Sequence, residues 1–294
     1  MSKMLVENDF GRAELYELAQ DIQAVRFVHQ TGQGSVSLYG GQVLSWQPQG
    51  HKPVFWLSKN SQYSAGKAIR GGVPICWPWF GGEVKLASGE TEKASNHGFA
   101  RQSQWQLVDI KLSAAGVEII LSLAGEKFAS QWPAAFELRQ TLHFGASFQQ
   151  TLAIKNLSEQ TLEYTGALHS YFCVSDPEHC TIPRLNNHVF DDKFSNSVAQ
   201  KSPLNNCSGP IDRIYHHSDS VEIIDKKWQR KIVLSSQGCQ QWVLWNPGEA
   251  AQAMADVHRH GGNEFVYLEA ANTQWQQIAA HSGVSISQTV NVAT

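Results

Sequence analysis

The stretch FELRQTLHF, residues 136–144, decides the fold class of this 294-residue chain. Apolar and polar residues alternate along it: Phe136, Leu138, Leu142 and Phe144 share one parity, and Glu137, Arg139, Thr141 and His143 share the other. Successive side chains of a β-strand point to opposite faces of the sheet, so this alternation is typical of a strand with one buried face. The pattern predicts a half-buried strand.

The same alternation recurs elsewhere in the chain. Leu152 and Ile154 repeat it directly downstream, and the C-terminal segment 284–292 shows it again. Turn residues such as Gly81-Gly82 and Asn246-Pro247-Gly248 separate the runs. No strand–helix–strand rhythm and no repeat of about 20–50 residues is visible. Short strands with frequent turns predict an all-β protein, an antiparallel sandwich or barrel.

The N-terminal region is where a helical spacing stands out. Leu15, Leu18 and Ile22 recur at intervals of three and four after the capping signal Asn8-Asp9. This spacing predicts a short helix. Residues 195–212 have the loosest pattern, and we expect them to form a long loop.

Composition favours one globular domain. With 42% hydrophobic residues the chain can bury a substantial core, and we expect a single domain, residues 1–294, with a short N-terminal extension at about 1–22. Its 23 Lys and Arg against 26 Asp and Glu leave no basic excess for nucleic acid. The sequence shows no signal-peptide pattern and no apolar run of about 18 residues, so we expect a cytoplasmic protein without membrane contact. Its five cysteines form no C-x-x-C pair and are expected to be free thiols.

The segment RGGVPICWPWFGG, residues 70–82, fits neither a helix nor an ordinary strand. Its alternating prolines and tryptophans are too rigid for a helix interior. Gly71 and Gly72 allow the backbone to approach a ligand closely, and Arg70 offers a planar set of donors suited to phosphate or carboxylate. The segment is therefore a candidate binding loop, with a packed structural loop as the alternative interpretation.

Three further segments carry candidate functional groups. They are NHGFAR with Asn96, His97 and Arg101, ALHSYF with His169, and EFVYLEA with Glu269. A carboxylate at the end of an apolar run is costly unless it is paired or functional. A lone histidine in a strand is usually a packed or surface residue, so none of these segments decides a function alone.

Together, the motifs resemble those of the hexose-6-phosphate mutarotases, the glucose-6-phosphate 1-epimerases of the aldose 1-epimerase group. The resemblance covers about residues 25–292 and rests on six ordered motifs: RGGVPICWPWFG, NHGFAR, ALHSYF, IDRIY, WNPG and VYLEA. It implies a galactose-mutarotase-like antiparallel β-sandwich, or supersandwich, with a shallow cleft on one sheet. It also implies an isomerase that uses neither a cofactor nor a metal.

The resemblance assigns an acid–base pair. His169 resembles the general acid that protonates the ring oxygen, and Glu269 resembles the general base that removes the anomeric hydroxyl proton. The ring then opens, and rotation about C1–C2 presents the other aldehyde face for closure. The residue types suit this chemistry because one proton is delivered and one is removed near neutral pH. A nearby Glu269 carboxylate is expected to favour protonated His169, and a desolvated cleft is expected to raise the basicity of Glu269.

The resemblance also implies substrate contacts. Arg70 and Arg101 resemble sugar-binding arginines, and at least one is expected to bind the 6-phosphate. Asn96 and Asp212 are expected to contact the substrate, and His97 resembles a histidine that lies near the sugar. The family commonly has a glutamine where this chain has Asn96. A loop aspartate that caps a turn is the alternative interpretation of Asp212.

The expected function is interconversion of the α and β anomers of a hexose 6-phosphate, by a monomer with no nucleic-acid or membrane partner. Two alternatives stay open: an aldose 1-epimerase acting on unphosphorylated hexoses, and a non-catalytic sugar-binding protein that uses the tryptophan-rich surface. No metal site is expected. The histidine pairs at 216–217 and 258–260 lack accompanying carboxylates at fixed spacing.

Overall fold

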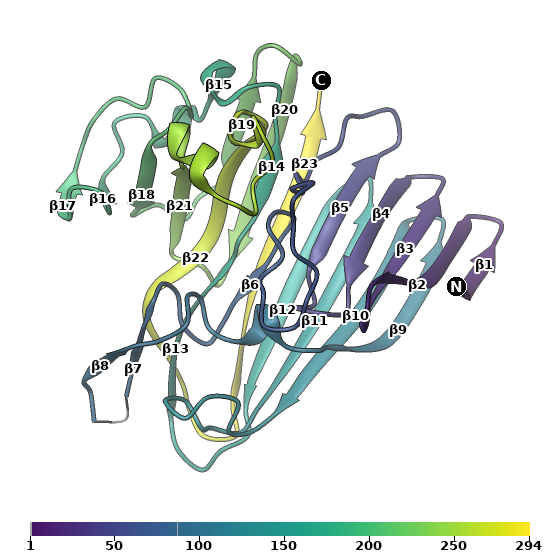
Figure 1. Ribbon diagram of the computed structural model, residues 1–294, viewed down its shortest axis with the longest axis horizontal. Helices are drawn as coiled ribbons and strands as arrows, with labels where there is room; N and C mark the ends of the chain where they lie inside the picture. The colour runs from purple at the N-terminus through teal and green to yellow at the C-terminus, as the bar shows by residue number, and fades with distance from the viewer. Residues whose placement is uncertain (1, 87) are drawn as a thin grey trace.

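The computed structural model describes residues 2–86 and 88–294. In this part of the chain 23 strands form four antiparallel sheets, and no α-helix is present (Figure 1). Five 3₁₀ helices connect strands: η1 (Ala100–Gln102), η2 (Pro177–His179), η3 (Pro183–Leu185), η4 (Gly248–Ala253) and η5 (Gly261–Asn263).

Two of the sheets are the N-terminal sheet and the long sheet. The N-terminal sheet has the order β1 (Lys3–Asn8), β2 (Gly11–Ala19), β3 (Ile22–His29), β4 (Gly32–Ser37) and β5 (Val43–Pro48). The long sheet has the order β15 (Cys180–Thr181), β19 (Val221–Asp225), β20 (Arg230–Gln237), β23 (Gly283–Ala293), β12 (Phe148–Asn156), β11 (Phe136–Gly145), β10 (Gly116–Gly125) and β9 (Gln106–Ser113).

The third sheet and a small hairpin complete the fold. The third sheet has the order β17 (Ser197–Gln200), β16 (Phe190–Asp192), β18 (Ile211–Tyr215), β21 (Gln241–Asn246), β22 (Phe265–Ile278), β13 (Leu162–Leu168) and β6 (Ile75–Cys76), and β14 (Tyr171–Cys173) also pairs with β22. The hairpin consists of β7 (Glu83–Lys85) and β8 (Thr91–Lys93).

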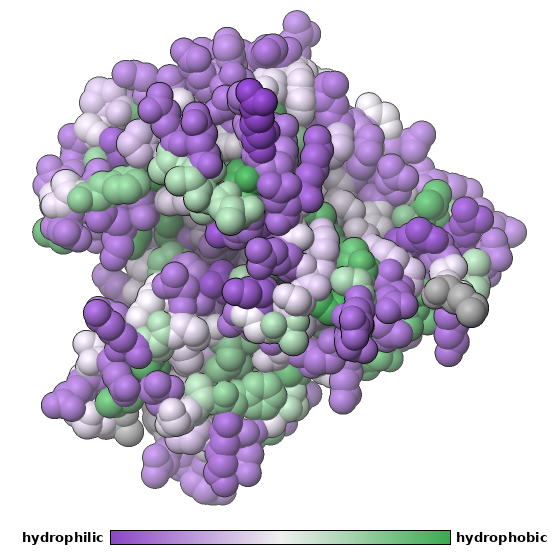
Figure 2. Space-filling view, viewed as in Figure 1, coloured by the Kyte–Doolittle hydropathy of each residue, from purple (hydrophilic) through white to green (hydrophobic). Residues whose placement is uncertain are grey.

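One apolar core joins the three large sheets. The ring of Phe27 on β3 lies 4.8 Å from that of Phe144 on β11, and Trp46 on β5 lies 5.8 Å from Phe148 on β12. The same core cluster includes Leu268 of the third sheet. Each sheet therefore buries one face against the others, as layered β folds require. Hydrophilic side chains cover most of the face shown in Figure 2.

The predicted strands are confirmed. Residues 136–144 lie within β11, and residues 284–292 lie within β23. Leu138 and Leu142, on the predicted apolar parity, have no solvent exposure. No helix in the described residues is long and apolar enough to cross a membrane. The expected long loop at 195–212 contains the short edge strand β17.

The helix predicted near residues 15–22 is wrong, because this region forms β2 and the start of β3. A register irregularity between Glu17 and Ala19 interrupts the strict alternation of β2. Leu15 consequently packs against the main core, whereas Leu18 packs with Ile22 in a separate cluster. The spacing of three and four arises from a strand with a bulge-like irregularity instead of a helical turn.

Candidate active site

The register of the third sheet gathers polar side chains on one of its faces. Asp212 on β18 lies opposite Trp245 on β21, which in turn lies opposite Tyr267 on β22. Glu269 follows Tyr267 by two positions and therefore points to the same face. The intervening residue Leu268 points into the core. The alternation that buries one face thus places Asp212, Tyr267 and Glu269 together on the other.

The proline–tryptophan segment places His169 beside this face. The backbone N–H of His169, just after β13, donates to the carbonyl oxygen of Pro74 at 3.0 Å. Strand β13 also pairs with β6 through Ala167 and Cys76. At Gly72 the φ angle is +64°, and a Cβ atom there would lie 2.0 Å from a carbonyl oxygen. The segment is therefore a packed structural loop that also adjoins the site, and its role in binding stays a prediction.

A cavity of about 360 Å³ opens onto these side chains, within the usual size range of small-ligand pockets. Its lining includes five of the seven residues predicted as site residues: Arg70, His97, His169, Asp212 and Glu269. At its base Glu269 is fully buried and His169 is 6% exposed. Residues separated by about two hundred positions in the sequence thus converge on one cavity.

Glu269 and His169 lack partners in the ligand-free cavity. Among the described residues, no hydrogen bond reaches either carboxylate oxygen of Glu269 or Nδ1 of His169. One oxygen of Glu269 and one ring nitrogen of His169 lie within 4.8 Å of each other. A buried polar group without a partner is costly in free energy, so the pair is poised to accept hydrogen bonds or protons from a ligand.

Burial determines the protonation of this pair. It raises the pKa of Glu269 well above its ordinary 4.5, and the nearby hydroxyl of Tyr267 opposes this rise without reversing it. Burial, with contributions from His97 and Arg101, lowers the pKa of His169 well below 6.5. Burial therefore favours the state of the free pair in which Glu269 carries the proton and His169 is neutral. Desolvation thus opposes the protonation of His169 expected from a nearby carboxylate, and it agrees with the rise in the basicity of Glu269 expected from a desolvated cleft.

His97 is fixed as a neutral hydrogen-bond donor. Its backbone has a left-handed φ of +63°, and its N–H donates to the carbonyl oxygen of Gly81 at 2.6 Å. The N–H of Gly81 in turn donates to Nδ1 of His97 at 3.1 Å. Burial lowers the pKa of His97 to about 3, so the ring is neutral and its proton is on Nε2. Its ring centroid lies 5.2 Å from that of His169.

Arg70 lines the cavity with part of its hydrogen-bonding capacity already used. Its Nε donates to a carboxylate oxygen of Asp256 at 2.9 Å, and one terminal nitrogen donates to the hydroxyl of Tyr171 at 2.9 Å. The adjacent Tyr171 and Asp256 raise the pKa of Arg70, so the guanidinium stays charged. It is a rigidly held cation whose charge is partly balanced within the protein.

Asn96 and Arg101 do not line the cavity. A terminal nitrogen of Arg101 donates to the backbone oxygen of Asn96 at 2.7 Å. Asn96 instead lines a neighbouring depression of about 460 Å³, here called the side hollow. The side hollow and the cavity share Phe80, Gly81 and Lys193. The predicted substrate contacts of Asn96 and Arg101 stay predictions.

Lys193 is a functional candidate that the sequence did not single out. It follows β16, is exposed, and lines both the cavity and the side hollow. Its backbone N–H donates to the carbonyl oxygen of Asp212 at 2.9 Å. Burial raises the pKa of Asp212 to about 6, and Lys193 opposes that rise. No spacing in the sequence indicated that this lysine faces the cavity.

Tyr171 and Tyr267 were also missed, although strand periodicity carried a signal for both. Tyr171 lies two positions after His169, and Tyr267 lies two positions before Glu269. Both rings pack on the imidazole of His169, with centroids 5.2 and 4.1 Å away. Both tyrosines lie inside the motifs ALHSYF and EFVYLEA, and considering the residues two positions from His169 and Glu269 would have found them.

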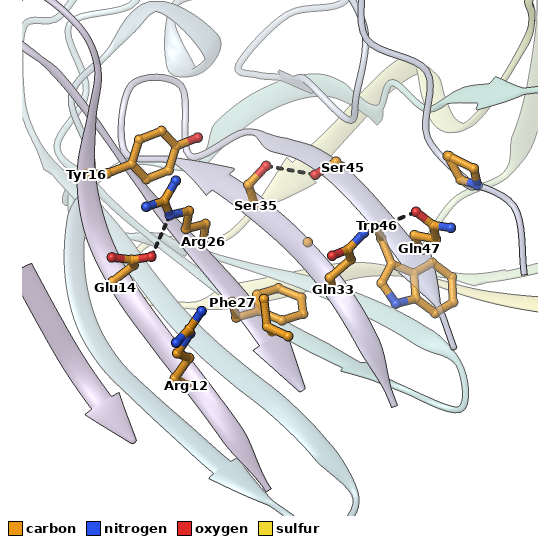
Figure 3. A pocket seen from close by; sticks show the side chains of 13 residues that line it. Arg12, Glu14, Tyr16, Arg26, Phe27, Gln33, Ser35, Ser45, Trp46 and Gln47 are labelled. Carbon is orange, nitrogen blue, oxygen red and sulfur yellow. Dashed lines mark hydrogen bonds and ion pairs between the residues drawn. The ribbon is translucent and has the colours of Figure 1, made fainter. Parts of the chain in front are cut away.

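A second depression, the sheet hollow, lies on the outer face of the N-terminal sheet (Figure 3). It is larger, at about 570 Å³, but six of its polar side chains are hydrogen-bonded to each other in pairs. These pairs are Arg26 with Glu14 at 2.6 Å, Ser35 with Ser45 at 2.8 Å and Gln33 with Gln47 at 3.2 Å. Size alone therefore favours the wrong depression, and the unpartnered buried pair marks the cavity as the candidate active site.

Comparisons with known proteins agree with this assignment. The family model described as Aldose 1-epimerase matches residues 23–293. A protein of Escherichia coli (strain K12) named "Putative glucose-6-phosphate 1-epimerase" is 32% identical over 271 residues, which cover 90% of this chain and 88% of the relative. A protein of Cenchrus ciliaris with the same name is 31% identical over 237 residues, which cover 75% of this chain and 69% of the relative.

A solved structure shows the same fold. The crystal structure of "a putative mutarotase (YeaD) from Salmonella typhimurium" superposes with a TM-score of 0.86 at 29% sequence identity. The superposition covers 100% of this chain and 97% of that chain. The galactose-mutarotase-like β-sandwich predicted from the sequence is thereby confirmed.

Fold, cavity and relatives define an enzyme, an isomerase that acts on the anomeric centre of sugars. The chain belongs to the aldose 1-epimerase family. A non-catalytic sugar-binding protein, the alternative from another functional class, is set aside by this membership.

Proposed function

We propose that this chain interconverts the α and β anomers of a hexose 6-phosphate, with glucose 6-phosphate as the first candidate substrate. The observation that carries the proposal is the unpartnered pair of Glu269 and His169 at the base of the cavity. The printed names of relatives at 31–32% identity support a phosphorylated hexose. No cofactor enters the proposed reaction.

In the proposed mechanism the pair passes one proton in each direction. Glu269 takes the proton of the anomeric hydroxyl while protonated His169 gives a proton to the ring oxygen. The bond between C1 and the ring oxygen breaks, and C1 becomes an aldehyde carbon. After rotation about C1–C2, the C5 hydroxyl adds to the other face and both protons return. Each positioned group typically contributes about 10²–10⁴ in rate.

The pKa shifts favour ring opening in this scheme. Opening leaves Glu269 protonated and His169 neutral, which is the state that burial favours in the free cavity. Before opening, the proton of the pair must move from Glu269 to His169. Sugar hydroxyls bound in the cavity supply the hydrogen bonds that an ionised Glu269 lacks in the free enzyme.

Lys193 is our first candidate for the phosphate contact. It is an exposed cation at the boundary of the cavity and the side hollow, and it takes part in no ion pair among the described residues. Arg70 also faces the cavity, but Asp256 already balances its charge. We therefore assign the phosphate to the side where Lys193 lies and sugar hydroxyls to Arg70.

Exchange NMR tests the proposal. The α to β exchange rate of glucose 6-phosphate and of glucose is measured with and without the protein, after subtraction of the spontaneous rate. We expect strong acceleration for glucose 6-phosphate, little for glucose, and loss of the effect in Glu269→Gln. Equal acceleration of both sugars would favour the unphosphorylated-hexose alternative, and no acceleration of either would refute the proposal.

Three further predictions from the sequence accompany this function. We propose that the enzyme acts as a monomer, in the cytoplasm, and on a small molecule without nucleic-acid or membrane partners. The low content of charged residues, 17%, and the lack of a basic excess support the absence of a nucleic-acid partner.

A further inference from the structure

A thiol lies beside the buried acid–base pair. Cys76 is fully buried on β6, and its Sγ, one ring nitrogen of His169 and one carboxylate oxygen of Glu269 all lie within 4.8 Å of one another. We propose that Cys76, His169 and Glu269 form a binding site for a thiophilic divalent cation, Zn²⁺ in the first place, and that occupation of this site inhibits the enzyme.

The register of the third sheet explains why these three side chains meet. Cys76 pairs with Ala167 on β13, and Ala167 pairs with Ala271 on β22, two positions beyond Glu269. Small side chains at these two positions leave the thiol close to the carboxylate. Cys76 packs in one cluster with both alanines, on the face of the sheet that bears Glu269.

The donor set and its spacing fit zinc. Thiolate, imidazole and carboxylate are all zinc ligands, whereas Mg²⁺ and Ca²⁺ require mainly oxygen donors. A tetrahedral Zn²⁺ with bonds of about 2.0–2.3 Å places its ligand atoms roughly 3.5 Å apart. Three donors already within 4.8 Å reach that spacing through small side-chain adjustments.

The donors are also free to bind. Both oxygens of Glu269 and Nδ1 of His169 have no hydrogen-bond partner among the described residues, although both side chains are more than nine-tenths buried. Glu269 and His169 line the cavity, so a cation can enter from there and keep a fourth position open to water. Binding releases the thiol proton of Cys76 to solvent, together with the proton that burial keeps on Glu269 in the free cavity.

Inhibition follows from the identity of the ligands. A cation held by His169 and Glu269 occupies the two groups that the proposed reaction needs for proton transfer. Zn²⁺ and the sugar therefore compete for one cavity. Binding of the cation itself does not depend on the proposed function, so the two can be tested separately.

The test combines cation binding with inhibition, on the full chain in metal-free buffer. Co²⁺ serves as a spectroscopic probe, because a cobalt–thiolate bond gives a near-ultraviolet charge-transfer band, and Zn²⁺ serves in the exchange assay. We expect the band in the natural chain and its loss in Cys76→Ala and Cys76→Ser. Cys207→Ser is the matched control, since Cys207 is also a fully buried free thiol but lies outside the cluster.

Inhibition is scored against the metal-free activity of each variant. We expect reversible inhibition of the natural chain by micromolar Zn²⁺, relief by a chelator and protection by the sugar. The Cys76 variants should need at least about tenfold more Zn²⁺ for the same inhibition. Loss of a residue that only supports a metal ligand already lowers metal affinity by about tenfold or more, so loss of a direct ligand should cost at least that much. Absence of the cobalt–thiolate band, or equal Zn²⁺ sensitivity of the Cys76 variants and Cys207→Ser, would overturn the inference. A band without mutarotation would leave the cation site standing and refute the proposed function.

Discussion

The cavity and the sheet hollow differ in how their polar groups are satisfied. In the sheet hollow Arg26 is bonded to Glu14 at 2.6 Å, and both side chains retain solvent contact. In the cavity, both carboxylate oxygens of the buried Glu269 and Nδ1 of the buried His169 have no hydrogen-bond partner among the described residues. Natural folds rarely tolerate unsatisfied buried groups, so their presence in one depression indicates function more reliably than depression volume does.

The largest expected effect is on kcat/KM, when the glutamate of each depression is replaced by glutamine. Glu269→Gln removes the proposed general base and should lower kcat/KM for glucose 6-phosphate by about 10²–10⁴. Glu14→Gln removes the carboxylate of the sheet hollow and should leave kcat/KM unchanged. Exchange NMR on both variants checks this prediction, and similar losses in the two would contradict the comparison.

A second contrast concerns cations. Lys193→Met should raise KM for glucose 6-phosphate about tenfold, equivalent to ~1.4 kcal/mol, because a charge-assisted contact to phosphate is lost. The kcat should stay close to its original value. Arg12→Met, in the sheet hollow, is the control and should leave KM unchanged. An unchanged KM in Lys193→Met would remove this residue from the phosphate contact.

The pH dependence sharpens the role of Asp212. Burial raises the pKa of Asp212 to about 6, so this carboxylate is ionised above that pH and protonated below it. If ionised Asp212 binds the sugar, kcat/KM should fall as the pH drops below about 6. His169 does not cause this limb, because its lowered pKa places its protonation at lower pH.

Asp212→Asn provides the control for this limb. The phosphate of the substrate titrates equally in both proteins, so the ratio of the two pH profiles isolates the aspartate. The ratio should lose the limb near pH 6. The same acid limb in the variant and the natural chain would assign it to the substrate instead.

The last expected effect is on stability instead of catalysis. The raised pKa of Glu269 means that the folded chain binds more protons than the unfolded chain at pH values above 4.5. Stability therefore falls as the pH rises from 4.5 towards the folded-state pKa, by up to about 1.4 kcal/mol per pH unit. Glu269→Gln should lack this slope and be the more stable protein at pH 8.

Urea unfolding at pH 5 and pH 8 measures the difference between the two proteins. Glu14→Gln is again the control, because its carboxylate keeps solvent contact and its pKa is lowered by the hydrogen bond from Arg26. It should not gain stability at pH 8. A pH-independent difference between Glu269→Gln and the natural chain would show that Glu269 ionises freely in the cavity.

The sequence was most informative where local geometry is repetitive. The alternation in residues 136–144 predicts β11 because a strand that buries one face must alternate. The prediction from spacing failed at Leu15, Leu18 and Ile22, because the irregularity near Glu17 gives a strand the spacing of a helix. Strand existence could be predicted, but a local break in register could not.

The site could be predicted only in part. The motifs brought His169, Glu269 and Asp212 to attention, but their convergence depends on the pairing of β18, β21 and β22. The exposure of Lys193 to the cavity depends on the pairing of β16 with β18, and the position of Cys76 beside the pair depends on the pairing of β6, β13 and β22. Burial raises the pKa of Glu269, in the direction expected for a desolvated cleft, and lowers the pKa of His169, against the protonation expected from a nearby carboxylate.

The protonation of Glu269 tests the central claim most directly. Carbon-13 NMR of the glutamate carboxyl groups, with Glu269→Gln used to assign the resonance, gives the charge of Glu269 in the free enzyme. The account predicts a protonated carboxyl at pH 7, with titration well above the ordinary glutamate range. A resonance at the ionised position at pH 7 would contradict the claim that the cavity holds an unpaired, charge-free acid–base pair.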